Sequence, residues 1–344
     1  MYRDLRLGED RKDSKPSTPS SARLRRSTRT TTWAIFNYSS IYSLNFLKLP
    51  PVEPPSIGLP YDEHEIAETD QWSPYPEHGQ VTFHWNLMYN KLCELAMICW
   101  KISKLLFSSR SKDDMNSSRA AAEAIGEELV IWRTQLPFEL RRHSGMAPPI
   151  MEVHAISYYA SITLMEFLKK PEVVPPSTPT NIEFVNKQDQ RTILCVMEVY
   201  TLIEIFSKAY TTARPAPSLF QGASVGAFTL IKSLDTPENV PVFTQFCKFV
   251  IAGAKHHVLW RGIAGMIRLT AERVGVTLPS ALDQELLDVT KGIFHSEDRK
   301  TLNNSQYPSY TLAKDMMRED DFTLGELLDK WDSLEIEATN DEGS

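Results

Sequence analysis

The strongest helical pattern in the chain lies in residues 88–106, MYNKLCELAMICWKISKLL. Its apolar residues recur every three or four positions, and that spacing places them on one stripe of an α-helix: Met88, Leu92, Leu95, Cys99, Ile102 and Leu106. A stripe of this kind is typical of a helix that packs on a hydrophobic core. The stretch therefore predicts a buried helix in the first third of the chain.

The segments on both sides repeat this periodicity. Before it, helical spacing runs from Trp33 through Phe36, Ser40 and Leu44 to Leu47. After a polar linker, a second face carries Ala121, Ile125, Leu129, Trp132 and Leu136. Pro137 is expected to end that helix, because proline disfavours the helical conformation of the residue before it. A further helix starts near Pro149 and places on one face His154, Tyr158, Met165 and Leu168.

Helical periods continue towards the C-terminus. Residues 189–210 read as a helix through Ile193, Val196, Tyr200 and Ile203. A further helical segment covers residues 218–234, and a long pair of helical segments covers residues 242–275. No segment alternates convincingly with period two, the pattern of a half-buried strand. The sequence therefore predicts an all-α fold, an irregular multi-helix bundle of seven to nine helices.

Composition excludes some classes of protein. The chain has 344 residues, of which 42% are hydrophobic, enough for a sizeable core. No apolar run reaches the roughly 18 to 20 residues of a membrane span, and the N-terminus has no apolar secretory signal. Four widely spaced cysteines do not suggest a disulfide framework, so a reducing compartment is expected.

Charge is distributed unevenly along the chain. Residues 1–32 contain nine lysines or arginines and four acids, a net charge of +5, whereas the whole chain carries −7. A basic head rich in Ser, Thr and Pro predicts a disordered arm over residues 1–32. The RLRRSTR stretch, residues 23–29, has two open interpretations: a solvated tail, or a nuclear-import or nucleic-acid signal.

The other end is acidic. Residues 281–344 are predicted to form a tail, and Glu319–Ser344 holds ten acids and one base, Lys330. Apolar residues are interleaved with these acids, a pattern typical of a transcriptional activation segment. An ordinary amphipathic helix docked on the body is the alternative. The apolar residues of the predicted activation segment are Phe322, Leu324, Leu327, Leu328 and Trp331.

The order of these segments resembles the regulatory domain of fungal zinc-cluster (Zn2Cys6) transcription factors, also called the fungal-specific transcription factor domain or middle homology region. In that family a W-x-x-F helix precedes a Gly-Arg-Pro-like turn, and a W-x-x-x-L-P helix end precedes a Leu-His helix that closes on Arg-Pro. The resemblance covers residues 33–280, and within the family the nitrogen-assimilation regulators look most similar. The matching residues are Trp33 and Phe36, Trp132 with Leu136 and Pro137, and His154 with Tyr158 and Pro171.

The chain departs from the family pattern at three places. Lys48-Leu49-Pro50 stands where Gly-Arg-Pro is expected, Lys170 replaces the arginine before Pro171, and Val153 replaces the leucine before His154. The family domain normally begins well before its W-x-x-F helix. The resemblance therefore implies that this chain starts inside the domain.

The family binds DNA through a zinc cluster held by six closely spaced thiolates, since soft sulfur ligands suit two zinc ions. This chain has only Cys93, Cys99, Cys195 and Cys247. We expect no metal, cofactor or catalytic site in it, and DNA contact only through a partner or a zinc cluster encoded upstream.

The resemblance implies a nuclear regulator of transcription that binds other transcription factors or coactivators, and an effector, with homo- or heterodimers as further options. No membrane association is expected. Because ligand sites often lie between the helices of bundles, the region around Trp132, His154 and Tyr158 is the expected place for an effector pocket.

Two other functions stay open. Gly222–Gly226, GASVG, matches the G-x-S-x-G nucleophile elbow of serine hydrolases, with Ser224 as nucleophile and Asp283 and His295 as partners. That motif needs a preceding strand, and two prolines precede it here, so glycines that let two helices approach closely explain it more simply. An all-helical scaffold with no link to transcription is the remaining alternative.

Overall fold

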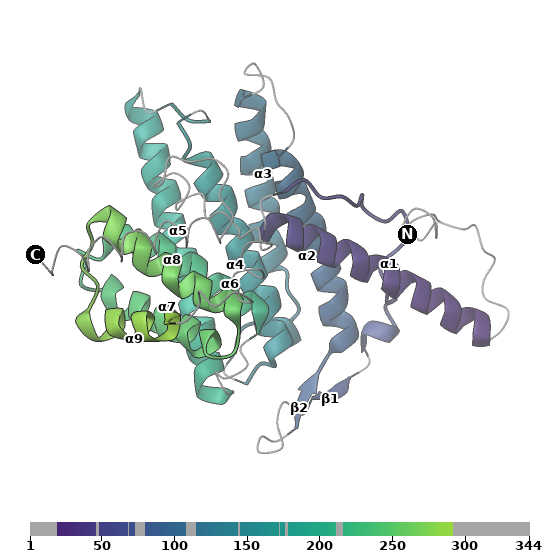
Figure 1. Cartoon of the computed structure of the whole chain (residues 1–344). Helices are drawn as coiled ribbons and strands as arrows, with labels where there is room; N and C mark the ends of the chain where they lie inside the picture. The colour runs from purple at the N-terminus through teal and green to yellow at the C-terminus, as the bar shows by residue number, and fades with distance from the viewer. Residues whose placement is uncertain are drawn as a thin grey trace, which may run out of the picture. The chain divides into compact units, whose positions relative to one another are not determined.

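The computed structural model describes residues 19–45, 48–67, 69–72, 80–107, 115–143, 145–171, 173–175, 178–210 and 216–291. These residues form nine α-helices, and their only strands are the short pair β1 (Asp70–Trp72) and β2 (Val81–Phe83), which pair antiparallel with Gln71 opposite Thr82. The predicted all-α fold with seven to nine helices is therefore confirmed (Figure 1). None of the helices in these ranges is both long and apolar enough to cross a membrane.

The chain forms two compact units, Met1–Gln188 and Asp189–Ser344. The boundary falls within α5 (Pro179–Ala209), which begins ten residues before the predicted residue 189. The predicted regulatory domain, residues 33–280, thus includes parts of both units.

In the first unit, α2 (Trp85–Phe107) contacts α1 (Pro19–Asn45), α3 (Met115–Thr134) and α4 (Pro148–Leu168). Figure 1 shows α1 running across α2. Four of the six residues of the predicted stripe are buried, namely Met88, Leu95, Cys99 and Ile102. Because several helices surround α2, residues outside the stripe are buried as well, among them Tyr89, Cys93 and Ile98.

The N-terminal helix is longer than expected. It begins at Pro19, so residues 19–32 of the predicted disordered arm are helical and the prediction is wrong for them. Interactions distant in sequence explain this. Arg26 forms an ion pair with Glu65, and Arg29 donates a hydrogen bond to the Leu59 carbonyl, 30 positions away. Residues 1–18 of the arm lie outside the described residues.

The connection between α3 and α4 follows the expected punctuation. α3 ends at Thr134, and Pro137 precedes the short 3₁₀ helix η3 (Phe138–Leu140). Prolines at the first positions of α4 suit a helix start, where their missing N–H groups have no intrahelical acceptor. Most of α4 is buried, on more than the single predicted face, since both α2 and α3 pack on it.

The second unit is built on α7 (Asn239–Ala254) and α8 (Val258–Val274). α6 (Pro217–Leu230), followed by η4 (Ile231–Ser233), contacts both, and so does α9 (Ser280–Thr290). Arg268 on α8 pairs with Asp283 on α9 at 2.9 Å. Residues 281–290 of the predicted acidic tail therefore belong to a packed helix, which buries Leu282 and Leu286.

Candidate functional site

The predicted effector-site residues lie on α3 and α4. Trp132 and His154 are buried, whereas Tyr158 is half-buried. His154 and Tyr158 lie one helical turn apart on α4, and their rings stack with centroids 6.5 Å apart. The Nε2 atom of His154 is 2.8 Å from the carbonyl oxygen of Leu140, so this histidine ties α4 to η3.

Arg133 is a member of this group that the sequence analysis did not identify. Its guanidinium lies over the Tyr158 ring, 5.3 Å from the centroid. The same group donates hydrogen bonds to the Ser157 carbonyl at 3.1 Å and to the Ser161 hydroxyl at 2.8 Å. Arg133 thus joins α3 to α4. The only sequence feature that could have indicated this role is its position directly after Trp132.

Two buried polar atoms in this region have no hydrogen-bond partner among the described residues: Nε1 of Trp132 and Nδ1 of His154. Such groups are uncommon in folded proteins, because each loses its hydrogen bonds to water on burial. When His154 Nε2 carries the proton, Nδ1 can accept a hydrogen bond, and the Trp132 indole can donate one. The effector pocket itself stays a prediction.

The environment of His154 makes the stability of the folded chain depend on pH. Burial lowers its pKa below the ordinary value of 6.5, the bond to Leu140 opposes this, and the charges of Arg142 and Arg133 add to the lowering. The unfolded chain therefore binds a proton at His154 more readily than the folded chain does. Stability from this group is complete above about pH 6.5 and falls as the pH drops below it.

We therefore expect the urea midpoint of the wild type to fall between pH 7 and pH 5, and His154→Gln to reduce that fall. Glutamine keeps an N–H donor for Leu140 and does not titrate. His256→Gln, which changes an exposed histidine, is the control. An unchanged pH dependence in His154→Gln would show that His154 does not contribute.

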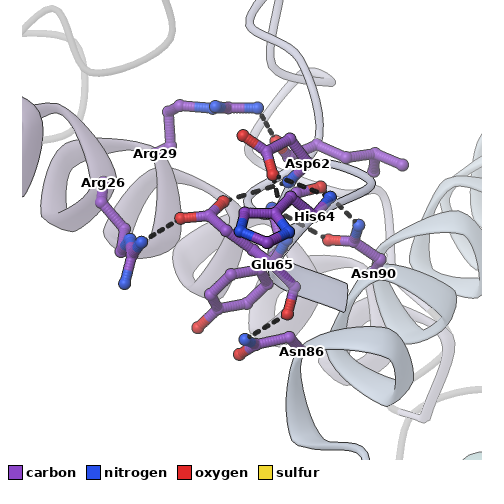
Figure 2. A network of polar contacts seen from close by, with 9 residues as sticks. Arg26, Arg29, Asp62, His64, Glu65, Asn86 and Asn90 are labelled. Carbon is purple, nitrogen blue, oxygen red and sulfur yellow. Dashed lines mark hydrogen bonds and ion pairs between the residues drawn. The ribbon is translucent and has the colours of Figure 1, made fainter. Parts of the chain in front are cut away.

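A second polar group lies where α1 and α2 meet the segment between them (Figure 2). The Asp62 carboxylate accepts hydrogen bonds from the backbone N–H groups of His64 and Glu65, at 3.2 and 3.0 Å. Glu65 returns one, since its carboxylate accepts from the Asp62 N–H at 3.0 Å. This reciprocal pair is a capping box at the start of η1 (Glu65–Ala67).

Both flanking helices hold this cap in place. Arg26 on α1 forms an ion pair with Glu65, and Asn86 on α2 donates to the Glu65 carbonyl at 2.8 Å. Asn90, also on α2, exchanges two hydrogen bonds with the backbone of Tyr61, at 2.8 and 3.2 Å. The network in Figure 2 thus fastens residues 59–65 to two helices.

The same two helices also share an apolar cluster. Trp33 and Phe36 of α1 pack with Tyr89, Cys93 and Ala96 of α2, and partly buried side chains from residues 52–61 cover them. The Trp33 indole also donates to the Gly58 carbonyl at 2.9 Å. The W-x-x-F residues of the sequence motif therefore anchor α1. The sequence feature that could have predicted the polar network is the Asp62-x-x-Glu65 spacing, which is typical of a capping box.

The residue proposed as a hydrolase nucleophile has a structural role. Ser224 is fully buried in the interior of α6, and its hydroxyl donates to the Phe220 carbonyl at 2.9 Å. A nucleophile elbow instead places its serine on a turn after a strand. A Cβ at Gly222 would lie 2.9 Å from Val199, and one at Gly226 2.5 Å from Phe246. The glycines therefore permit close helix packing, as the simpler interpretation predicted, and His295 lies outside the described residues.

The cysteines do not gather into a metal site. Cys93, Cys99 and Cys247 are buried and Cys195 is half-buried. Within the described ranges, no group of three or more His, Cys, Asp or Glu side chains could hold a metal ion. Burial raises the pKa of Cys93 and of Cys99 to about 12, and raises that of Cys247 too.

Because the thiolate is the reactive form, the buried thiols should react slowly with a disulfide reagent. We expect the native chain to be labelled rapidly at Cys195 alone, and all four cysteines to be labelled in urea. Cys195→Ser should remove the rapid phase. Rapid labelling of a second cysteine in the native chain would contradict the burial described here.

The predicted activation segment, with Phe322, Leu324, Leu327, Leu328 and Trp331, lies outside the described residues. Several large apolar side chains are exposed among the described ones. They include Leu24, Tyr38 and Tyr42 on α1, Ile131 on α3, and Phe138 on η3. These side chains are candidates for contact with other macromolecules.

Comparison with known proteins identifies a fungal relative. The chain is 22% identical over 267 residues to the notoamide biosynthesis transcriptional activator notL' of Aspergillus versicolor. The matched region is 75% of this chain and 43% of that protein, so the chain spans less than half of the relative's length. No family model matches the chain. No solved structure matches it. The similarity supports the prediction of a fungal transcription factor, and the domain type stays a prediction.

Proposed function

We propose that the chain is a regulatory module of a fungal transcription factor, which controls transcription in the nucleus by binding other proteins. The observation that carries this proposal is the similarity to a fungal transcriptional activator over three quarters of the chain. The order of the sequence motifs supports the same assignment. The module then corresponds to the family's middle homology region.

The features of the helical body are consistent with binding rather than catalysis. Ser224 is buried and bonded within its own helix, and the polar network of Figure 2 satisfies its members by mutual hydrogen bonds. Exposed apolar side chains on α1 and η3 offer surfaces for coactivators or other transcription factors. An effector would lie near Trp132 and His154, where two buried polar atoms have no hydrogen-bond partner among the described residues.

DNA contact would come from a partner, or from a zinc cluster outside this sequence, because four separated cysteines cannot supply six thiolates. The acidic segment Glu319–Ser344 would recruit coactivators through its apolar residues, while its carboxylates keep it solvated. The chain would act alone or as a homo- or heterodimer.

A reporter assay tests the proposal. The full chain is fused to a heterologous DNA-binding domain and compared with the same fusion lacking residues 319–344. We expect the full fusion to change reporter expression, and the deletion to lower any activation. The control replaces Phe322 and Trp331 with alanine, which keeps the charge of the segment. A full fusion that equals the DNA-binding domain alone would reject the proposal.

A further inference from the structure

The outer face of α1 carries a continuous uncharged stripe. Its members follow one another by three or four positions, so they share one side of the helix: Leu24, Ser27, Thr31, Ala34, Tyr38 and Tyr42. All six are exposed, with Leu24 at 69% and Tyr38 at 71%. The rings of Tyr38 and Tyr42 stack, with centroids 5.7 Å apart. The stripe presents an apolar residue at one end and two aromatic rings at the other.

Every charged residue of α1 itself is basic. No aspartate or glutamate occurs between Asp13 and Glu53. Of the four arginines on α1, Arg26 pairs with Glu65 and Arg29 donates to the Leu59 carbonyl. The other two, Arg23 and Arg25, are exposed and have no ion-pair partner among the described residues. They project about 100° to either side of Leu24, so cations flank the apolar stripe on both sides.

The first turns of α1 are exposed. Ser20 and residues 23–27 are all exposed. The helix has no acid in its first turn, although its N-terminal dipole favours negative charge there. A helix rich in serine, threonine and arginine gains little from its own contacts in water, and packing supplies most helical stability in proteins. An acidic partner would complement both the arginines and the dipole.

We propose that this face of α1 binds an amphipathic helix of a partner protein, in which carboxylates flank a stripe of leucine-like residues. The proposal names the class of partner for the protein binding proposed above and rests on that function. Arg23 and Arg25 would pair with the carboxylates, and Leu24, Tyr38 and Tyr42 would pack on the apolar stripe. Ala34, in the middle, lets the two helices approach closely.

A protein helix explains this face better than a nucleic acid does. The stripe from Leu24 to Tyr42 is about 27 Å long at 1.5 Å per residue, whereas Arg23 and Arg25 lie only at its N-terminal end. A phosphate backbone would use the arginines and would leave the apolar remainder unexplained. A helix with acidic flanks uses the whole length, as in recognition of an amphipathic helix by an apolar surface.

Fluorescence anisotropy on the full chain tests the proposal. The probe is a labelled synthetic amphipathic helix of about 20 residues, long enough to be partly helical alone, with leucine on one face and glutamate on both flanks. A matched probe has lysine in place of glutamate. We expect the glutamate probe to bind about tenfold more tightly than the lysine probe, since each exposed ion pair contributes a factor of about 2 to 5.

Charge reversal gives the sharpest comparison. Arg23→Glu with Arg25→Glu should reverse the preference between the two probes. Lys187→Glu with Lys248→Glu, an equal charge change at exposed lysines elsewhere, should leave it unchanged. Tyr38→Ala with Tyr42→Ala should weaken both probes, with the helical content by circular dichroism unchanged.

Two results would overturn the proposal. One is that the wild type binds both probes equally tightly, or binds neither probe. The other is binding of a labelled DNA duplex that the arginine variant loses while no helical probe binds, which would assign the face to phosphate groups. None of these measurements reads transcription, so the failure of this proposal is distinct from a silent reporter.

Discussion

Replacing Gly253 with alanine should destabilise the second unit by about 3 kcal/mol, because the added methyl group has no space. A Cβ at this position would lie 1.5 Å from Cε3 and 1.8 Å from Cζ3 of Trp260. The indole cannot easily move away, since Trp260 is buried and its ring stacks on Phe220 with centroids 3.7 Å apart and planes within 6°. The backbone of α7 or α8 must then shift.

Gly126→Ala is the matched control. Gly126 lies within α3, and a Cβ there would meet Leu164 at 3.5 Å, an ordinary van der Waals contact. Alanine is the better helix former, so this change should stabilise the chain by up to about 1 kcal/mol. Urea unfolding monitored by circular dichroism compares the two. Equal unfolding free energies for Gly253→Ala and Gly126→Ala would contradict the close approach of Gly253 to Trp260.

Replacing Phe36 with alanine should have the largest effect of any change on α1, a loss of about 3 to 5 kcal/mol. Its side chain is fully buried and forms an edge-to-face pair with Trp33, with centroids 5.7 Å apart. The substitution leaves a cavity in the cluster that joins α1 to α2 and to Leu59 and Tyr61. We expect faster hydrogen exchange across α1 and residues 59–65 as well as a lower urea midpoint.

Tyr38→Ala provides the comparison on the same helix. Tyr38 is two positions away and 71% exposed, so its loss should change the unfolding free energy by no more than about 0.5 kcal/mol. Hydrogen exchange at residues 59–65 should then match the wild type. Similar exchange in both variants would mean that Phe36 does not anchor α1.

Local pattern predicted most of the helices but not all of their bounds. The stripe in residues 88–106 and the Leu136-Pro137 end became α2 and the end of α3, because periodicity and proline geometry act over a few neighbouring residues. The starts of α1 and α5 came earlier than predicted, at Pro19 and Pro179. For α1 the added turns are polar, and their contacts with Leu59 and Glu65 cannot be read from a local period.

In the candidate site, too, local pattern predicted some of the residues and not others. The motif predicted Trp132, His154 and Tyr158, and the rings of His154 and Tyr158 do stack. Arg133 was not predicted, since it contacts α4 only through partners 24 to 28 positions away. Ser224 illustrates the reverse. Its motif suggested a nucleophile, and the surrounding helices decided instead that glycines there allow close packing with Val199 and Phe246.

By itself the sequence determined that this chain is all-helical, where most of its apolar faces lie, and which family it resembles, since these follow from spacing along the chain. Only the tertiary structure decided which polar groups meet: Arg26 with Glu65, Asn90 with Tyr61, and Arg133 with Ser161. It also decided that the outer face of α1 remains exposed. Such outcomes depend on which helices pack together, and helix packing joins residues that no local period relates.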